Sequence, residues 1–193
     1  NAVAREGDII QQRSAHGRSA LTYQGGRELF NPAGLLEKAR KAGMEAVELL
    51  TAEPCPNGKR TLVLMPDQMM LQIHESVGHA LEIDRILGDE RNYAGGSFIT
   101  PEDIGRFRYG SPLMNVAFDP TIAQELASYG ADDIGNAAVK EYLIKDGILI
   151  RALGSLESQK RSGLRGVANQ RACSWNRPPI DRMANLNLEA GTS

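Results

Sequence analysis

The sequence has 193 residues and a formal net charge of −2, from 22 Lys and Arg against 24 Asp and Glu. This length suits one or two domains, and the balanced charge lacks the basic excess that is typical of nucleic-acid-binding proteins. No apolar run approaches the roughly 18 residues that a membrane-spanning helix requires, so we expect no membrane span. The two cysteines, Cys55 and Cys173, lack the spacing of a disulfide framework, which favours a cytoplasmic location.

The first part of the chain predicts little regular structure before one long helix. Residues 1–30 are polar and glycine-rich, with a candidate strand at 20–23. Asn31 followed by proline is a favourable helix start, and apolar residues then recur at near-helical spacing. We therefore predict a helix over 32–49, loosened near Gly43.

A change in composition marks a domain boundary after this helix. Residues 52–58 contain two prolines and an Asn-Gly pair, which is typical of a linker, so we divide the chain into 1–54 and 55–193. The apolar run 60–65 then predicts a buried strand. A helix should follow, capped by Asp67, running to about Leu87 and ending at Gly88.

The predicted helix carries two of the three histidines of the chain, His74 and His79, five residues apart. On an ideal α-helix they would lie about 140° apart around the axis and about 7.5 Å apart along it. The arc between them also holds Gly78, Glu82 and Glu75, and the apolar residues of the helix lie on the opposite side. Gly78 has no side chain, so we expect it to leave space there for an ion or a substrate. A local widening to i→i+5 hydrogen bonding would align the two imidazoles, and such bulges occur mostly at functional sites.

These residue types on one arc indicate a metal site. Neutral imidazoles are good Zn²⁺ ligands, and catalytic zinc usually has three protein ligands and an open position. Glu75 directly follows the first histidine and is a candidate general base. Three roles stay open for Glu82: it orients a histidine from behind, stands in as a third ligand, or is a solvated helix glutamate.

The rest of the sequence alternates loops with short strands. Residues 88–112 are loop-rich, 113–118 predict a strand, and 121–129 a loop or a short helical turn. A hairpin is predicted over 139–153, because Asp146-Gly147 favours a tight turn.

The C-terminal part predicts a loop and one last strand. Residues 154–171 are rich in serine, glycine and arginine, and we expect a solvated loop whose basic side chains are a weaker candidate for binding a substrate carboxylate. These side chains are Lys160, Arg161, Arg165 and Arg171. We expect Trp175 to pack beside Pro178-Pro179, and residues 185–189 to form the final strand.

Residues 74–84, His-Glu-Ser-Val-Gly-His-Ala-Leu-Glu-Ile-Asp, resemble the signature of the TldD/PmbA metallopeptidases, in particular the metal-bearing TldD branch. Weaker similarity extends over 25–27, 60–65, 131–133, 141–149 and 178–185. The resemblance implies an α+β fold with a catalytic helix packed on mainly antiparallel sheet. It further implies that 1–54 is the end of an α/β N-terminal domain and 55–193 the first part of the metallopeptidase catalytic domain.

The resemblance also implies an activity. His74 and His79 would bind Zn²⁺, and Glu75 would activate a metal-bound water in a peptidase acting on peptides or unfolded segments. The family works as a dimer, so a homodimer or a heterodimer with a paralogous subunit is expected. Its third ligand is a cysteine in a Cys-Gly-Lys stretch, expected beyond Ser193, so the 193 residues alone should hold metal weakly and be inactive. Cys173 is a rival third ligand.

Two other functions remain open. The protein could be a non-catalytic metal-binding or assembly subunit of a heteromeric peptidase, although retention of all three of His74, Glu75 and His79 argues against a vestigial motif. It could also be an iron-dependent redox or oxygenase domain, which needs a nearby carboxylate ligand such as Glu82. Metal analysis would separate these functions as zinc, none or iron.

Overall fold

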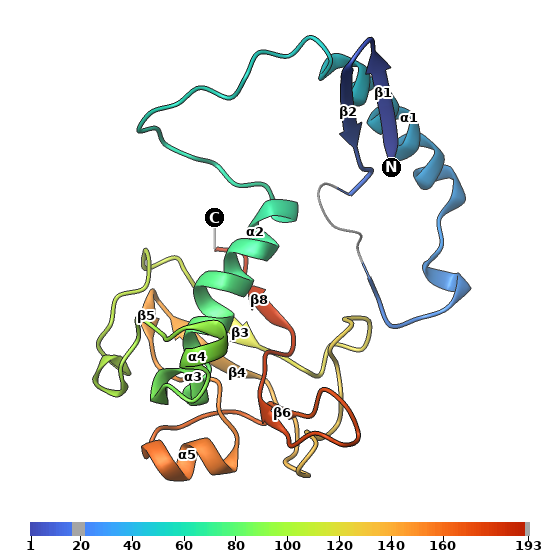
Figure 1. Ribbon diagram of the computed structural model, residues 1–193. Helices are drawn as coiled ribbons and strands as arrows, with labels where there is room; N and C mark the ends of the chain where they lie inside the picture. The colour runs from blue at the N-terminus through green and yellow to red at the C-terminus, as the bar shows by residue number, and fades with distance from the viewer. Residues whose placement is uncertain (17–21, 192–193) are drawn as a thin grey trace. The chain divides into compact units, whose positions relative to one another are not determined.

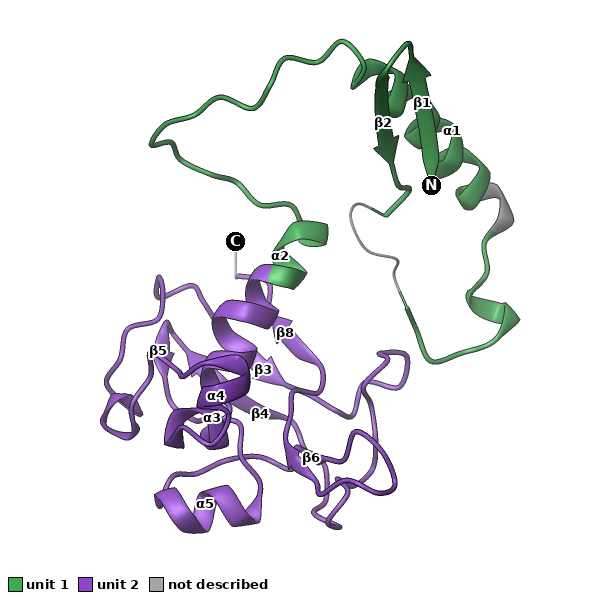
Figure 2. Ribbon diagram, in the orientation of Figure 1, with its two compact units in different colours: residues 1–71 green, residues 72–193 purple. Residues whose placement is uncertain are grey.

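The computed structural model describes residues 1–16 and 22–191 (Figure 1). The chain divides into two compact units, Asn1–Leu71 and Gln72–Ser193 (Figure 2). This division falls inside a helix, later than the boundary that we predict at the 52–58 linker. Because a compact unit and a domain of a family need not share their limits, the boundary at 54/55 stays a prediction.

The first unit is a β-hairpin with one helix packed on it. Strands β1 (Ala2–Glu6) and β2 (Ile9–Arg13) pair antiparallel around a turn in which Gly7 has φ +58°. Helix α1 (Pro32–Glu48) contacts both strands, and Arg13 Nε on β2 lies 2.7 Å from Glu45 Oε2 on α1. The sequence analysis missed this hairpin, because its strands are mostly polar and exposed and show little hydrophobic alternation.

Helix α1 confirms the helix predicted over 32–49. The side chain of Asn31 accepts a hydrogen bond from the Gly34 backbone N–H at 3.1 Å, which is the predicted N-cap. The expected loosening near Gly43 is wrong, since the helix runs through that residue without a break. A short 3-10 turn, η1 (Arg27–Leu29), precedes it. Of the predicted strand at 20–23, residues 20 and 21 lie outside the described residues.

The predicted buried strand at 60–65 is wrong. These residues have no strand pairing in the described part of the chain, and Leu62 and Val63 are 77% and 83% exposed. A strand requires a partner for its backbone groups, and an apolar run by itself cannot supply one. The linker predicted at 52–58 is confirmed as an irregular segment.

The second unit is built on a four-stranded antiparallel sheet in the order β5-β4-β3-β8. The strands are β3 (Val116–Phe118), β4 (Glu141–Lys145), β5 (Ile148–Leu149) and β8 (Leu186–Leu188). Buried side chains of β3, β4 and β5 form much of the core, among them Phe118, Leu143 and Leu149. A second sheet pairs β6 (Gln170–Arg171) with β7 (Ile180–Asp181). The predicted α+β class with mainly antiparallel sheet is confirmed.

The hairpin predicted over 139–153 is also confirmed. Asp146 and Gly147 connect β4 to β5 with φ angles of +50° and +76°, the left-handed conformations that a tight type I′ turn requires. A side chain at Gly147 would also collide with the carbonyl oxygens of Gly110 and Ser111. The strands predicted at 113–118 and 185–189 are present in shorter form as β3 and β8, and 121–129 is a loop.

Two predictions for the C-terminal part are wrong. Residues 154–171 are not all loop: they include α5 (Leu156–Ser162), on which the guanidinium of Arg161 binds both carboxylate oxygens of Asp89 at 2.6 and 2.9 Å. That pairing engages the Arg161 guanidinium in an ion pair within the protein. Trp175 is 95% exposed and does not pack beside the prolines.

The helical segment that carries the histidines is divided into several pieces. They are α2 (Pro66–Ile73), the π-helical turn η2 (His74–Gly78), the 3-10 turn η3 (His79–Leu81) and α3 (Ile83–Leu87). Asp67 lies in the first turn of α2, not before it. The segment ends at Gly88, as predicted, with φ +90°. Two short elements follow, α4 (Arg91–Ala94) and η4 (Pro101–Asp103).

None of the helices in the described residues combines the length and the apolar character needed to cross a membrane.

Candidate metal centre

The helix widens at the residues that the sequence analysis singled out. In η2 the backbone N–H of His79 donates to the carbonyl of His74, five residues earlier, instead of to the residue four earlier. This turn contains one more residue than an α-helical turn. Residues five apart are therefore aligned here, as residues four apart are in an α-helix. The i→i+5 widening is therefore present, and it brings the two imidazoles together, with ring centroids 4.6 Å apart and planes at 90°.

Gly78 has a different role from the one that the sequence suggested. We expected a residue without a side chain to leave space for an ion or a substrate. In the structure Gly78 is buried, and a Cβ at this position would collide with the sulfur of Met183. The absence of a side chain at Gly78 thus lets Met183, in the segment between β7 and β8, pack directly against the π turn. Gly78 therefore faces the interior of the protein, where it allows close packing, and it does not face the metal group.

Among the described residues, one group of His, Cys, Asp and Glu side chains has metal-binding geometry: His74, Glu75 and His79. One ligand atom from each lies within 4.8 Å of the others. His74 and Glu75 are exposed and His79 is partly buried, so the group opens to solvent on one side. Cys173 is exposed, free and outside the group. An open face with two nitrogens and one carboxylate suits a divalent cation that also binds water or substrate.

The electrostatics of the two imidazoles match such a cation. Partial burial lowers the pKa of His74, and the neighbouring His79 lowers it further. Burial also lowers the pKa of His79, with a second contribution from the Arg85 guanidinium. Both rings are therefore favoured in the neutral form, which has a free lone pair for a metal. The two imidazoles fit Zn²⁺, and with Glu75 as the candidate general base they are one short of the three protein ligands that are usual for catalytic zinc.

Glu82 lies directly behind this group. The chain leaves helical geometry at Glu82, with ψ +120°, and its side chain is completely buried. Its Oε2 atom lies 2.9 Å from Nδ1 of His79. If Nδ1 carries the hydrogen and donates to Glu82, the lone pair of Nε2 is left free for a metal. The solvated alternative for Glu82 is thus wrong, and the geometry favours the role of orienting a histidine.

A small network of charges surrounds Glu82. Arg85 Nε lies 3.4 Å from Glu82 Oε2, and Arg85 Nη2 lies 3.1 Å from Glu90 Oε2. Arg182, from the segment after β7, approaches the other oxygen of Glu90 at 3.6 Å. Burial nevertheless raises the pKa of Glu82 to about 7, and its Oε1 atom has no hydrogen-bond partner. Sequence reasoning missed Arg85 and Arg182, although Arg182 lies in the 178–185 stretch of the family resemblance.

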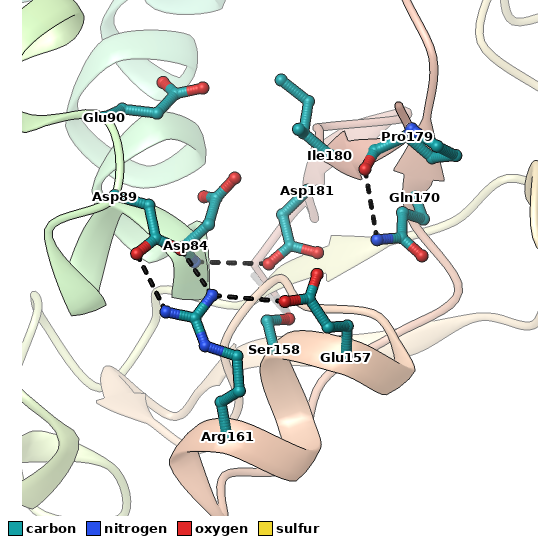
Figure 3. A pocket seen from close by; sticks show the side chains of 10 residues that line it. All are labelled: Asp84, Asp89, Glu90, Glu157, Ser158, Arg161, Gln170, Pro179, Ile180 and Asp181. Carbon is teal, nitrogen blue, oxygen red and sulfur yellow. Dashed lines mark hydrogen bonds and ion pairs between the residues drawn. The ribbon is translucent and has the colours of Figure 1, made fainter. Parts of the chain in front are cut away.

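A second cluster of carboxylates, which includes Asp84 and Asp181, lies around α3, α5 and β7. It lines a cavity of about 230 Å³ (Figure 3). The Asp84 backbone N–H donates to Asp181 Oδ2 at 3.3 Å, and the Ser155 N–H donates to Asp181 Oδ1 at 3.0 Å. Burial raises the pKa of Asp84 to about 7, with further increases from the carboxylates of Asp181, Glu82 and Glu90. Burial also raises the pKa of Asp181.

The raised pKa of Asp84 makes stability depend on pH. In the unfolded chain this carboxyl ionises near 3.8, and in the folded chain near 7. Between these values the folded chain binds more protons, so the free energy of unfolding falls as pH rises from about 4 to 7.

Replacing Asp84 with Asn should therefore raise the free energy of unfolding at pH 8 by up to about 4 kcal/mol, at about 1.4 kcal/mol per pKa unit. The Asn side chain keeps the oxygen that accepts the Arg85 N–H. Urea unfolding at pH 5 and pH 8 measures the effect. Asp89→Asn is the control: the Arg161 guanidinium lowers the pKa of Asp89, so no gain is expected there. Equal pH dependence in parent and Asp84→Asn would contradict the prediction.

The chain is similar to known proteins over most of its length. The family model described as the PmbA/TldA metallopeptidase C-terminal domain matches residues 57–193. Over 191 residues the chain is 34% identical to a metalloprotease of Methanothermobacter thermautotrophicus, covering 99% of this chain and 39% of that protein. Over 157 residues it is 31% identical to a metalloprotease TldD homologue of Haemophilus influenzae, covering 80% and 30%. The chain belongs to the TldD/PmbA metallopeptidase family.

Solved structures share the fold. The crystal structure of TldE from Thermococcus kodakarensis superposes with a TM-score of 0.68 at 16% identity, covering 98% of this chain and 39% of that one. A putative modulator of a DNA gyrase from Thermotoga maritima superposes with a TM-score of 0.66 at 19% identity, with the same coverage. At these identities the likeness concerns the fold alone. The chain spans well under half the length of the relatives it matches.

Proposed function

We propose that the whole protein, meaning this chain with any sequence that adjoins it, is a zinc-dependent peptidase acting on peptides or unfolded segments. The observation that carries the proposal is the π turn, which gathers His74, Glu75 and His79 within 4.8 Å on an exposed face. The names of the curated relatives, which are called metalloproteases, support the reaction class and imply a metal. Zinc is our choice because two neutral imidazoles suit it better than an oxygen-seeking cation.

In this proposal each side chain has one task. His74 and His79 hold the ion, which when bound polarises the peptide carbonyl and makes water more acidic. Glu75, which is exposed in the same group, would accept the proton of the attacking water and deliver it to the leaving amine. Glu82 fixes the His79 ring through Nδ1. No other metal-binding side chain in the described residues joins the group. We therefore propose that the third ligand is supplied by sequence outside these 193 residues, as the resemblance implies.

We also propose that the protein works in the cytoplasm as a homodimer or as a heterodimer with a paralogous subunit. Cytoplasmic location is supported by the two cysteines, both free and exposed, which a reducing compartment preserves. The dimer rests on the family resemblance.

Metal analysis tests the proposed function. The whole protein, purified without added metal, should contain about one zinc per active subunit, and removal of the metal by a chelator should abolish peptide hydrolysis. Iron in place of zinc would favour the redox alternative, and absence of metal would favour the assembly subunit. The 193-residue chain alone should bind zinc weakly, with or without Cys173→Ser. Tight, stoichiometric binding that Cys173→Ser removes would contradict our account of the missing ligand.

A further inference from the structure

The irregular helix that carries the metal group is held from outside by hydrogen bonds to its carbonyls. The Tyr109 hydroxyl donates to the Ser76 carbonyl, inside η2. The Ser97 hydroxyl donates to the Ala80 carbonyl at 2.6 Å, and the Leu153 N–H donates to the Leu81 carbonyl at 2.7 Å. Changes of helical pitch move carbonyls out of line with the donors of their own helix, and side chains or other backbone groups then satisfy them.

Of these three donors, Tyr109 reaches the π turn itself. Its acceptor, Ser76, follows Glu75 directly and lies two residues after His74. Burial raises the pKa of Tyr109 above its usual range, so the hydroxyl remains protonated and able to donate at any physiological pH. The hydrogen bond is part-buried, where competition from water is reduced.

The Tyr109 side chain is itself fixed in place. Its ring packs edge-on against Phe107, with centroids 5.5 Å apart, and against Phe98 at 6.0 Å. Its backbone N–H donates to the carbonyl of Gly147 at 2.8 Å. Gly147 is the turn residue of the β4–β5 hairpin, so the hydroxyl is anchored through one residue to the antiparallel sheet. Tyr109 thereby connects the antiparallel sheet to the π turn.

We infer that Tyr109 is a positioning residue that holds the π turn open and so sets the spacing of the two imidazoles for a divalent metal. Without this donor the Ser76 carbonyl loses its partner from outside the helix, and the i→i+5 bond between the His79 N–H and the His74 carbonyl, in a turn type that is rare in proteins, should break more often. The inference rests on the proposed function only for the metal. The effect of Tyr109 on the turn can be tested separately.

The test is Tyr109→Phe, which removes the donor and keeps the ring. Tyr129→Phe is the matched control, because the Tyr129 hydroxyl also donates to a backbone carbonyl, that of Ala168 at 2.8 Å, and is likewise half-buried. In the whole protein, amide hydrogen exchange at His79 should be at least about tenfold faster in Tyr109→Phe than in the parent and unchanged in Tyr129→Phe. Zinc affinity should fall by about tenfold or more in Tyr109→Phe alone.

The two measurements separate the inference from the proposed function. Unchanged exchange at His79 in Tyr109→Phe would overturn the inference, whether or not the protein binds zinc. Faster exchange together with parental zinc affinity would overturn the claim that Tyr109 sets the ligand spacing. A parent protein that binds no zinc would refute the proposed function, and the exchange data would still decide the role of Tyr109 in the turn. Thermal unfolding shows whether both variants are folded.

Discussion

Peptide hydrolysis by the whole protein should fall by a factor of at least about 10² when Glu75 is replaced by Gln, with metal content near that of the parent. Glu75 is exposed, and one of its carboxylate oxygens lies within 4.8 Å of a ring nitrogen of His74 and of His79. A glutamine there has nearly the same size and keeps a carbonyl oxygen, but it cannot accept a proton from water. Initial rates on an unstructured peptide and metal analysis of the same samples measure the two effects.

Glu102→Gln provides the control for this experiment. Glu102 is an exposed glutamate on the 3-10 turn η4, outside the metal group, and its replacement should leave the rate unchanged. A Glu75→Gln protein with parental activity would remove Glu75 from the mechanism. Loss of metal from Glu75→Gln would instead make Glu75 a ligand and leave the general base unassigned.

Replacing either His74 or His79 with Ala should remove bound zinc almost completely. The loss of affinity should exceed the 10–100-fold that is typical when an outer-shell partner is removed, because a direct ligand is lost. Both imidazoles have lowered pKa values from burial, so each is available as a neutral ligand in the parent, and neither can replace the other. Zinc content of the dialysed proteins gives the result.

His16→Ala is the matched control, since His16 is the remaining histidine and lies in a loop of the first unit. Its replacement should leave zinc content at the parental value. Full zinc in both His74→Ala and His79→Ala would place the metal site elsewhere. Loss of zinc in His16→Ala, with parental zinc in His74→Ala and His79→Ala, would mean that the group of His74, Glu75 and His79 is not the binding site.

Local patterns in the sequence predicted the elements whose interactions are mostly local. Asn31 starts α1, Gly88 ends α3, and Asp146-Gly147 forms the hairpin turn, because capping and turn conformation depend on residues a few positions apart. The widening of the helix could be anticipated for the same reason. Two histidines five residues apart on a polar arc can act together only if the turn takes one additional residue.

Predictions that depended on distant partners were less successful. The apolar run 60–65 has the composition of a buried strand, yet Leu62 and Val63 are exposed, since burial of a strand depends on a neighbouring strand that its own sequence does not encode. The burial of Glu82 could not be decided from its helical position. It follows from the break at that residue and from packing against Leu153, whose N–H and carbonyl bond the backbone on either side of it.

The sequence by itself selected the side chains that we propose as metal ligands and general base, and it placed them on one face of one helix. Spacing along a helix fixes the direction of each side chain, so His74, Glu75 and His79 could be selected without coordinates. Only the tertiary structure decided what holds that face in shape. Met183 fills the space beside Gly78, Glu82 supports His79, and Tyr109 binds the carbonyl of the widened turn. The contacts of Met183 and Tyr109 join residues far apart in the chain, and packing at such separations leaves no periodic pattern in a single sequence.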